Sequence, residues 1–337
     1  MNKEIVLGIL GAGRIGKVHT ESITTGIPGV RIKVIADPYM NAETEAWALS
    51  KGVEKVSKDS ADVLSDPEID AVLICSSTDT HAEFTRAAAR AGKHIFCEKP
   101  LDLDVDRIKE TLKIVEEAGV KFQIGFNRRF DHNFLALREA VKAGKIGEPH
   151  IVRITSRDPA PPNPAYIQSS GGIFMDMTIH DFDMVRYLSG SEVEEIYVNG
   201  AVLVDPEIGK AGDIDTAIIT MKLANGALAV IDNSRKAAYG YDQRAEVFGS
   251  KGAVASANDT LSTAVLSDET GVTAEKPLYF FLERYMASFT SEMKLFIKAI
   301  REDGPTPVGG LDALRPVQIA IAARESVKTG KPVKVKL

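Results

Sequence analysis

The sequence predicts an α/β protein in which a doubly wound parallel sheet is followed by an α+β domain with a large open antiparallel sheet. Over residues 5–126, short apolar, β-branched runs alternate with segments of helical period, and a glycine-rich turn follows the first run. Beyond residue 143 the apolar runs are longer, and hairpin signals join several of them. We therefore expect a first domain over residues 1–126 and a second over residues 127–337.

The first domain contains five predicted strands that alternate with four predicted helices. Each strand is a short apolar run, as in a parallel sheet that is covered on both faces. The strands span residues 5–11, 31–37, 71–76, 94–98 and 121–126. The helices, recognised from apolar residues three and four positions apart, span residues 15–24, 42–51, 80–91 and 104–117. Gly52, Gly92 and Gly119 stand just after helices, where a left-handed residue commonly ends the helix.

The second domain begins with a predicted helix over residues 133–143 and continues as a sheet. Its predicted strands span residues 150–156, 193–203, 217–223, 227–234 and 244–248. Ala224-Asn225-Gly226-Ala227 is typical of a hairpin turn, which implies antiparallel pairing. A proline-rich loop over residues 158–164 is stiff enough to act as a lid. The last predicted helices span residues 283–301 and 311–328.

Composition and charge indicate a soluble globular protein with a small-molecule partner. The chain has 337 residues, of which 44% are hydrophobic and 26% charged, and its formal net charge is −6. No basic block is present, so we expect neither a nucleic acid nor a membrane as partner. Cys75 and Cys97 lie in apolar runs and are expected to be buried thiols. The first residues do not resemble a signal peptide and no run is long enough to cross a membrane, so we expect a cytoplasmic protein.

The glycine-rich turn predicts a dinucleotide-binding site of the Rossmann type. It lies between the first strand and the first helix, where backbone amides and the helix N-terminus can approach a pyrophosphate. The candidate cofactor contacts in this turn are Gly11, Ala12, Gly13, Arg14, Ile15 and Gly16. Asp37 ends the second strand, 24 residues after Gly13, where a carboxylate can bind the adenosine ribose and would repel a 2′-phosphate. Residues 38–41 contain no Arg or Lys, so we predict NAD in preference to NADP.

Polar residues follow two further strands, at the edge where open α/β sheets bind ligands. The candidate cofactor contacts at these strand ends are Ser76, Ser77, Thr78, Glu98 and Lys99. Lys99 is held near the sheet because Pro100 restricts its backbone, although a solvated lysine is an equally acceptable interpretation. His81, in the helix after Thr78, is added to the cofactor contacts, although a packing role is the simpler interpretation.

Asp176, His180 and Asp183 follow Gly171-Gly172 at spacings that place all three on one face of a helix. Two acids beside an imidazole suit a metal site, an acid–base relay or a buried polar patch. A nicotinamide accepts hydride without a metal, and Lys99 would oppose a divalent cation, so we expect no metal ion. In the relay, His180 is the base that removes a hydroxyl proton, and Asp176 orients the imidazole. Lys99 would donate to the reacting oxygen and favour its alkoxide form.

These motifs together resemble those of a known enzyme family. Glu98-Lys99-Pro100, the glycine turn and Gly171-Gly172-x3-Asp176-x3-His180-x2-Asp183 are similar to motifs of the family of glucose-fructose oxidoreductase, inositol dehydrogenase and rhizopine-catabolism proteins. The likeness spans the whole chain. It is strongest to members that oxidise inositol, through Ser156-Arg157-Asp158-Pro159 and Asp232-Asn233-Ser234-Arg235.

The resemblance implies a fold, a reaction and a set of site residues. Family members join a dinucleotide-binding domain to a domain with a large open antiparallel sheet, through which they form tetramers, so a homotetramer is expected. The implied reaction is NAD-dependent oxidation of a cyclic polyol, with myo-inositol and its 2-keto product as the best match. The implied catalytic residues are Lys99, Asp176 and His180. The implied substrate contacts are Lys99, Arg129, Arg157, Asp176, His180, Asp183 and Tyr239.

Several alternatives stay open at the level of the sequence. The substrate could be another inositol isomer or an aldose, and residues near Tyr166, Arg157 and Tyr239 would decide between them. A nicotinamide-binding regulatory protein without turnover, or a metal-dependent lyase or hydrolase, would imply a different class of protein. From the residues alone, Arg128-Arg129 could be a solvated charge pair or make interdomain contacts, although a strand-end arginine can also hold a polyol hydroxyl, which we favour for Arg129. Tyr239, from the residues alone, is a core aromatic.

Overall fold

The computed structural model describes residues 4–163, 166–167 and 170–337, and the chain divides into two compact units. Unit 1 comprises Met1–Asn127 and Met286–Val317, and unit 2 comprises Arg128–Tyr285 and Gln318–Leu337. The sequence analysis placed residues 127–337 in one domain, whereas Met286–Val317 packs within unit 1. The physical reason is that Met293, Phe296 and Ile297 of α12 (Met286–Arg301) belong to the same hydrophobic core as the first strand.

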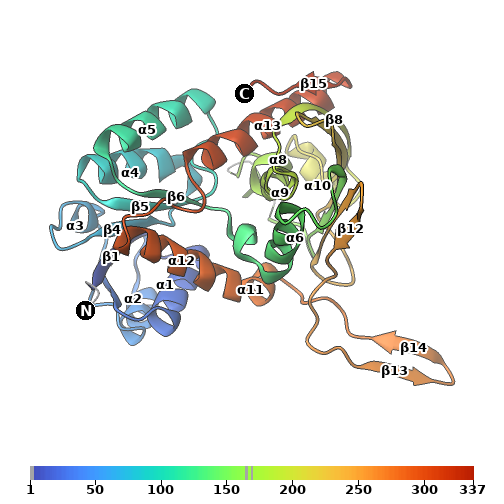
Figure 1. Ribbon diagram of the computed structural model, residues 1–337. Helices are drawn as coiled ribbons and strands as arrows, with labels where there is room; N and C mark the ends of the chain where they lie inside the picture. Colours follow the sequence, from blue (N-terminus) through green and yellow to red (C-terminus); the bar gives the residue numbers. More distant parts are fainter. Residues whose placement is uncertain (1–3, 164–165, 168–169) are drawn as a thin grey trace. The chain divides into compact units, whose positions relative to one another are not determined.

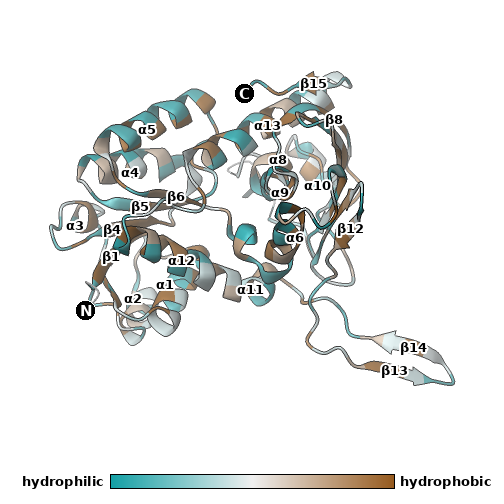
Figure 2. Cartoon of the chain, viewed as in Figure 1, coloured by the Kyte–Doolittle hydropathy of each residue, from teal (hydrophilic) through white to brown (hydrophobic). Residues whose placement is uncertain are grey.

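Unit 1 is built on a six-stranded parallel sheet with the strand order β3-β2-β1-β4-β5-β6 (Figure 1). The strands are β1 (Ile5–Leu10), β2 (Val30–Ala36), β3 (Lys55–Ser57), β4 (Ala71–Ile74), β5 (His94–Glu98) and β6 (Phe122–Gly125). The helices between them are α1 (Arg14–Gly26), α2 (Ala42–Ser50), α3 (Ala61–Leu64), α4 (Thr78–Arg90) and α5 (Val105–Ala118). Every residue of β1 and β4 is buried, and both strands are apolar (Figure 2). The predicted doubly wound parallel sheet is therefore confirmed.

The predicted elements of unit 1 agree with the structure to within two residues at each end. Two elements, β3 and α3, were not predicted, because segments of three and four residues are too short to show a period. Gly52, Gly92 and Gly119 adopt φ angles of +84°, +70° and +65°. The predicted helix stops are therefore confirmed as left-handed positions.

Unit 2 is built on a seven-stranded sheet with the strand order β12-β11-β7-β10-β9-β8-β15. The strands are β7 (Pro149–Arg157), β8 (Val193–Ala201), β9 (Thr216–Leu223), β10 (Leu228–Ser234), β11 (Asp242–Gly249), β12 (Gly252–Ala255) and β15 (Val333–Lys334). The predicted hairpin at Gly226, where φ is +87°, joins β9 to β10 and is confirmed.

One pair of strands corrects the expectation of a purely antiparallel sheet. All neighbouring strands of this sheet run antiparallel except β7 and β10, which are parallel. The parallel pair arises because the chain crosses from β7 through a helical segment to β8. It then returns by two antiparallel steps, through β9, to lie beside β7 as β10. Such a crossover cannot be recognised from the alternation within single strands.

Helices cover one face of this sheet and leave the other face exposed. The helices are α6 (His132–Lys142), α8 (Ile173–Asp176) and α9 (Thr178–Ser189), and α9 packs against β7 and β10 while α6 packs against α9 and β11. Buried and exposed residues alternate along β9. The exposed face carries the apolar side chains of Ile151, Ile218, Leu228 and Phe248.

The remaining elements differ in part from those predicted. The helix expected over residues 283–301 is broken at Tyr285 into α11 (Phe281–Arg284) and α12, whereas α13 (Gly310–Thr329) agrees with the prediction. α10 (Pro206–Lys210) and the exposed hairpin of β13 (Val265–Asp268) and β14 (Gly271–Ala274) were not predicted. Of the predicted proline-rich loop, residue 164 lies outside the described residues. No helix in the described part of the chain is long and apolar enough to cross a membrane.

Candidate active site

The glycine turn after β1 has the geometry that a phosphate-binding loop requires. Gly11 has a φ of +102°, and a Cβ there would lie 2.6 Å from the carbonyl carbon of Cys75. A Cβ on Gly16 would lie 2.2 Å from the carbonyl oxygen of Gly11. Gly13 differs, because a Cβ there would meet no atom within 4 Å. Gly11 and Gly16 are therefore needed for packing, whereas the exposed Gly13 leaves its backbone accessible to a ligand.

Asp37 lies directly beside this turn. Its Oδ2 accepts a hydrogen bond from the amide of Ala12 at 2.7 Å, and its Oδ1 accepts one from the amide of Tyr39 at 2.8 Å. The side chain is only half-buried, so the carboxylate keeps acceptor capacity for a ligand. Arg14 is exposed and Ile15 half-buried in the first turn of α1. The structure therefore brings the predicted turn residues and Asp37 together at the ends of β1 and β2.

The segments that follow β4 and β5 lie side by side because these strands are neighbours. The Oγ of Ser76 lies 2.6 Å from Oγ1 of Thr80, and Ser77 and Thr78 begin α4. His81 Nδ1 lies 2.8 Å from the carbonyl oxygen of Pro100, and Nε2 lies 3.0 Å from that of Ser76. Since His81 is buried and bonded to both segments, the structure favours the packing role over a cofactor contact.

Glu98 directs its side chain into the interior of unit 1, and Lys99 follows it at the end of β5. Glu98 is buried, and its Oε1 lies 2.6 Å from Nε2 of His19. The His19 ring is fully buried, with ring centroids 5.0 Å from Phe96 and 5.6 Å from Phe289. The sequence analysis did not identify His19 as the partner of Glu98, because the two are 79 residues apart in the chain.

Glu292 on α12 is a second buried acid in the interior of unit 1. It is fully buried, and neither of its carboxyl oxygens has a hydrogen-bond partner among the described residues. Burial raises the pKa of Glu292 well above its ordinary value, and the negative charge of Glu98 raises it further. The folded protein therefore holds a proton on Glu292 at pH values where an exposed glutamate has lost it.

Glu292→Gln is expected to reduce the loss of folding stability that the wild type shows as the pH rises. In the wild type, a raised pKa means that stability is fully present below the ordinary value of 4.5 and is lost as the pH rises towards the folded-state value. Gln has the same shape and no proton to lose. Melting temperatures of both proteins from pH 5 to pH 9 test this, with the exposed Glu110→Gln as control. Parallel curves for wild type and Glu292→Gln would contradict it.

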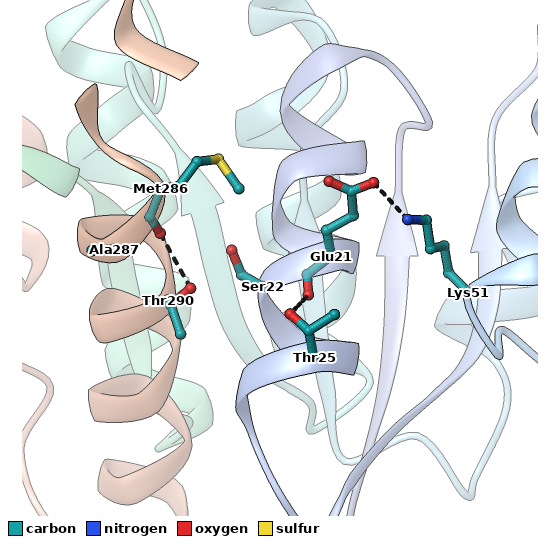
Figure 3. Close-up of a pocket in the computed structure, with 7 residues that line it drawn as sticks. All are labelled: Glu21, Ser22, Thr25, Lys51, Met286, Ala287 and Thr290. Carbon is teal, nitrogen blue, oxygen red and sulfur yellow. Dashed lines mark hydrogen bonds and ion pairs between the residues drawn. The ribbon is translucent and has the colours of Figure 1, made fainter. Parts of the chain in front are cut away.

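A pocket of about 390 Å³ lies between α1 and α12, and Figure 3 shows the side chains that line it. The lining residues are Glu21, Ser22, Thr25, Lys51, Met286, Ala287 and Thr290. Glu21 and Lys51 form an ion pair at 2.9 Å on one side of the pocket. The pocket lies along the C-terminal half of α1, whereas the glycine turn lies at its N-terminus, so the pocket is not the predicted cofactor site.

In unit 2, the segment that begins at Gly171-Gly172 forms two short helices in place of the single predicted helix. Both glycines have positive φ angles, +82° and +80°, and α8 ends at Asp176. Met177 interrupts the helix, and α9 then carries His180 and Asp183. The spacing argument of 100° per residue assumed a continuous helix. The interruption is a single residue, and the backbone of Met177 stays in the right-handed helical region, with a φ of −98° and a ψ of −61°. The placement of Asp176 on the same face as His180 and Asp183 therefore stays a prediction.

Asp176 is bound by two side chains that come from other elements. Its Oδ2 accepts a hydrogen bond from Arg235 Nη1 at 3.1 Å, and its Oδ1 accepts one from the Tyr166 hydroxyl at 3.1 Å. Arg235 directly follows β10 and is only 1% exposed. The sequence analysis quoted Arg235 within a motif but assigned it no role. A charged residue at the end of an apolar strand was the signal that could have singled it out.

Arg129 and Asp183, both predicted substrate contacts, bind one another. Arg129 Nε donates to Asp183 Oδ2 at 2.8 Å, and Arg129 Nη2 donates to Asp183 Oδ1 at 2.5 Å. The guanidinium of Arg129 also lies over the ring of Tyr187, 5.1 Å from its centroid. This bidentate pair fixes both side chains, so any hydrogen bond to a substrate must use the remaining donor and acceptor capacity.

Arg157 and Tyr239 form a second pair of predicted substrate contacts. Arg157 Nη1 donates to the Tyr239 hydroxyl at 3.0 Å, and the Tyr239 hydroxyl donates to Asp242 Oδ2 at 2.6 Å. Arg157 is also paired with Asp232. Arg157 ends β7 and Asp242 begins β11, so this pair and Arg235 lie at the same edge of the sheet.

Asp158 is a further acid at this edge, and the sequence analysis assigned it no role. Burial raises the pKa of Asp158 to about 7, and the negative charges of Asp176 and Asp181 act in the same direction. Arg235 and Arg128 oppose the shift. A carboxyl group that titrates near neutral pH beside Asp176 is suited to proton transfer. Within the described ranges, this site included, no group of three or more His, Cys, Asp or Glu is arranged to hold a metal ion.

The two units together define the class of protein. Unit 1 has a glycine turn with an accessible backbone at Gly13 and a carboxylate, Asp37, at the end of the next strand, as dinucleotide-binding domains require. Unit 2 carries the imidazole of His180 on α9, and it carries carboxyl groups that interact with Arg235 at the end of β10. These features define an NAD-dependent oxidoreductase, and the residues of unit 1 that would hold NAD fit its pyrophosphate and ribose.

Comparisons with known proteins identify the family. Residues 5–126 match the model described as "Oxidoreductase family, NAD-binding Rossmann fold", and residues 134–255 match the GFO/IDH/MocA C-terminal domain. The chain is 50% identical to a myo-inositol 2-dehydrogenase of Thermotoga maritima, over 98% of each chain. It is 46% identical to an inositol 2-dehydrogenase of Rhizobium meliloti, over 97% of this chain and 98% of that protein. The chain therefore belongs to the GFO/IDH/MocA oxidoreductase family.

Two solved structures share the fold, and one of them contains ligands. Scyllo-inositol dehydrogenase from Lactobacillus casei, with bound NAD(H) and scyllo-inositol, is 32% identical with a TM-score of 0.92, over 99% of each chain. A probable dehydrogenase from Thermotoga maritima is 49% identical with a TM-score of 0.95, over 98% of this chain and 99% of that one. The expected fold class and the expected NAD cofactor are confirmed by these likenesses.

Proposed function

We propose that this protein oxidises a secondary alcohol of a cyclic polyol to a ketone, with myo-inositol and its 2-keto product, scyllo-inosose, as the best candidates. The observation that carries the proposal is the presence of Lys99, Asp176 and His180 in a chain that is 50% identical to a myo-inositol 2-dehydrogenase. NAD, when bound, accepts the hydride that leaves the substrate carbon. The residues of this chain bind and orient the two reactants and manage the proton.

Each member of the proposed catalytic set has a separate task. His180 removes the hydroxyl proton, since an imidazole titrates close to neutral pH. Asp176 orients the imidazole and stabilises its protonated form. Lys99 stabilises negative charge on the reacting oxygen. Arg129, Arg157, Asp183 and Tyr239 supply hydrogen-bonding groups for the other hydroxyls of the substrate.

In unit 1, we assign the cofactor to the glycine turn, Asp37 and the polar strand ends. Helix α1 and the exposed backbone at Gly13 favour the negatively charged pyrophosphate. Asp37 accepts hydrogen bonds from the ribose hydroxyls and repels a 2′-phosphate, so NAD is preferred to NADP. The contacts at the strand ends are Ser76, Ser77, Thr78, Lys99 and the backbone of Glu98.

We also propose a homotetramer that forms through the exposed face of the unit 2 sheet. Ile151, Leu228 and Phe248 are neighbours across β7, β10 and β11, and all three are 36% or more exposed. A contiguous apolar face of this kind favours association with a second sheet. A cytoplasmic location is proposed as well, which the two free, buried cysteines support.

The proposed function is tested by supplying the purified protein with a panel of inositols and aldoses, with NAD or with NADP. Formation of reduced nicotinamide is followed by absorbance. We expect turnover with myo-inositol and NAD, and a lower kcat/KM with NADP. Preferred turnover of scyllo-inositol would favour the activity named for the Lactobacillus casei structure. Failure of every cyclic polyol and sugar to reduce NAD would refute the dehydrogenase, and equal use of NADP would refute the role of Asp37.

A further inference from the structure

Arg235 is a buried cation at the sheet edge that carries the proposed acid–base residues. Its side chain is 1% exposed, and its backbone amide donates to the carbonyl oxygen of Asp215 at 2.8 Å. Its Nη1 donates to Asp176 Oδ2 at 3.1 Å, and its Nη2 lies 3.8 Å from Asp213 Oδ2. Nε and Nη2 have no hydrogen-bond partner among the described residues. A purely structural side chain gains nothing from burying such donors, because unpaired buried donors cost free energy.

Asp213 connects this guanidinium to the start of α8. Asp213 Oδ2 accepts a hydrogen bond from the amide of Ile173, the first residue of α8, at 2.9 Å. A Cβ on Gly172 would lie 2.9 Å from Asp213 Oδ1, and the φ of Gly172 is +80°. Glycine is therefore required at position 172 both by its backbone conformation and by the closeness of the Asp213 carboxylate.

These contacts form a closed ring. Asp213 holds the first turn of α8, α8 carries Asp176 at its last position, and Asp176 binds Arg235, which faces Asp213 again. The carboxylate of Asp176 is thus held by the backbone of α8 and by the guanidinium, in addition to the hydrogen bond from the Tyr166 hydroxyl. Neither the helix spacing nor the family motif requires this arrangement.

We propose that Arg235 is a positioning residue that orients the carboxylate of Asp176 for His180, and that Asp213 anchors both Arg235 and α8. The inference rests on the proposed roles of Asp176 and His180 in the dehydrogenase reaction. Arg235 is a positively charged side chain beside a cluster of four acids, Asp158, Asp176, Asp181 and Asp213. The charged groups that act on this cluster from neighbouring elements are Arg128, Asp158, Asp181, Asp213 and Arg324.

The electrostatic balance supports this role for Arg235. Burial raises the pKa values of both Asp158 and Asp213, and Arg235 lowers both. Loss of the guanidinium charge would therefore alter the protonation of the whole cluster. Because a positive charge is lost from its surroundings, the His180 imidazole should titrate at a higher pH in the variant.

The test compares Arg235→Met, which removes the charge, with Arg235→Lys, which keeps the charge and loses the planar geometry. We expect Arg235→Met to lower kcat about 10- to 100-fold, the usual effect of losing a residue that orients a catalytic group. KM for NAD should stay within about twofold, and the acidic limb of the kcat–pH profile should move up by roughly half a pH unit. Arg235→Lys should recover part of the loss. Arg90→Met, at the exposed end of α4 in unit 1, is the matched control and should leave kcat unchanged.

Asp213→Asn keeps the shape and an acceptor for Ile173, so it separates the anchoring role from folding. If Arg235→Met does not fold, Arg235→Lys and Asp213→Asn decide the question. Folded variants with the wild-type kcat and pH profile would overturn the proposal. The imidazole titration of His180, followed by NMR and assigned with His180→Asn, gives a readout that needs no turnover. A wild type inactive on every polyol refutes the function, whereas an unchanged His180 titration in the Arg235 variants refutes the positioning role.

Discussion

Replacing His180 with Ala is expected to lower kcat by roughly two to four orders of magnitude, the range typical for loss of a general base. The affinity for NAD should be nearly unchanged, because the glycine turn and Asp37 lie in unit 1, whereas His180 lies on α9 in unit 2. Steady-state kinetics with the best polyol of the panel, together with NAD binding followed by fluorescence, measure the two quantities separately.

The control for this substitution is His132→Ala. The His132 side chain is 66% exposed at the first residue of α6, and it lies away from the sheet face proposed for association. Its loss should leave kcat within about twofold of wild type, as for other surface substitutions. Near wild-type turnover in His180→Ala would refute the base assignment. An equal loss in His132→Ala would attribute the effect to general destabilisation.

Local patterns were sufficient to predict most of unit 1. The strand β5 was predicted at its observed bounds, and Gly52, Gly92 and Gly119 end helices in left-handed conformations. These features depend on residues within a few positions of one another, namely the period of apolar side chains and the conformational freedom of glycine. The pattern therefore contains the necessary information without any knowledge of distant contacts.

Features that depend on distant contacts were not predicted. The return of α12 to the core of unit 1 depends on Phe296 and Met293 packing with residues more than 200 positions earlier. The parallel pairing of β7 with β10 is set by the crossover through α8 and α9, to which neither strand's own sequence contributes. The interruption at Met177, which divides the single predicted helix into α8 and α9, was likewise not predicted.

In the candidate site, too, features set by nearby residues were predicted and features set by distant contacts were not. The residue types of Lys99, Asp176 and His180 were available from motifs, since each motif lies within a few positions of the chain. Their partners were not, because Arg235 and Asp213 reach Asp176 and α8 from 59 and 40 residues away. The groups that perform the proposed chemistry are visible in the sequence, whereas the groups that orient them become visible only in the fold.

Asp181→Ala is expected to destabilise the protein by about 3–5 kcal/mol, the usual effect of removing one partner of a buried ion pair. Asp181 is fully buried, and its Oδ1 accepts a hydrogen bond from Arg128 Nη1 at 2.6 Å. Its Oδ2 accepts a second from Asn233 Nδ2 at 2.9 Å. The substitution would leave the buried guanidinium of Arg128 without this counter-charge. It would also remove a link between α9 and β10, which pack together.

Asp181→Asn separates the contribution of charge from that of hydrogen bonding. Burial raises the pKa of Asp181, whereas the charge of Arg128 and the hydrogen bonds to the carboxyl group lower it. We therefore expect both the charge and the hydrogen bonds to contribute to the free energy of unfolding. Asn keeps an acceptor for Arg128 and is expected to lose less stability than Ala. Urea unfolding followed by circular dichroism measures both variants, with Glu207→Ala as the control, since it removes an exposed pair with Lys210. That control should cost no more than about 1 kcal/mol. If Asp181→Ala costs no more than Glu207→Ala, the buried pair does not stabilise unit 2, because removal of a stabilising buried partner must cost more than removal of an exposed one.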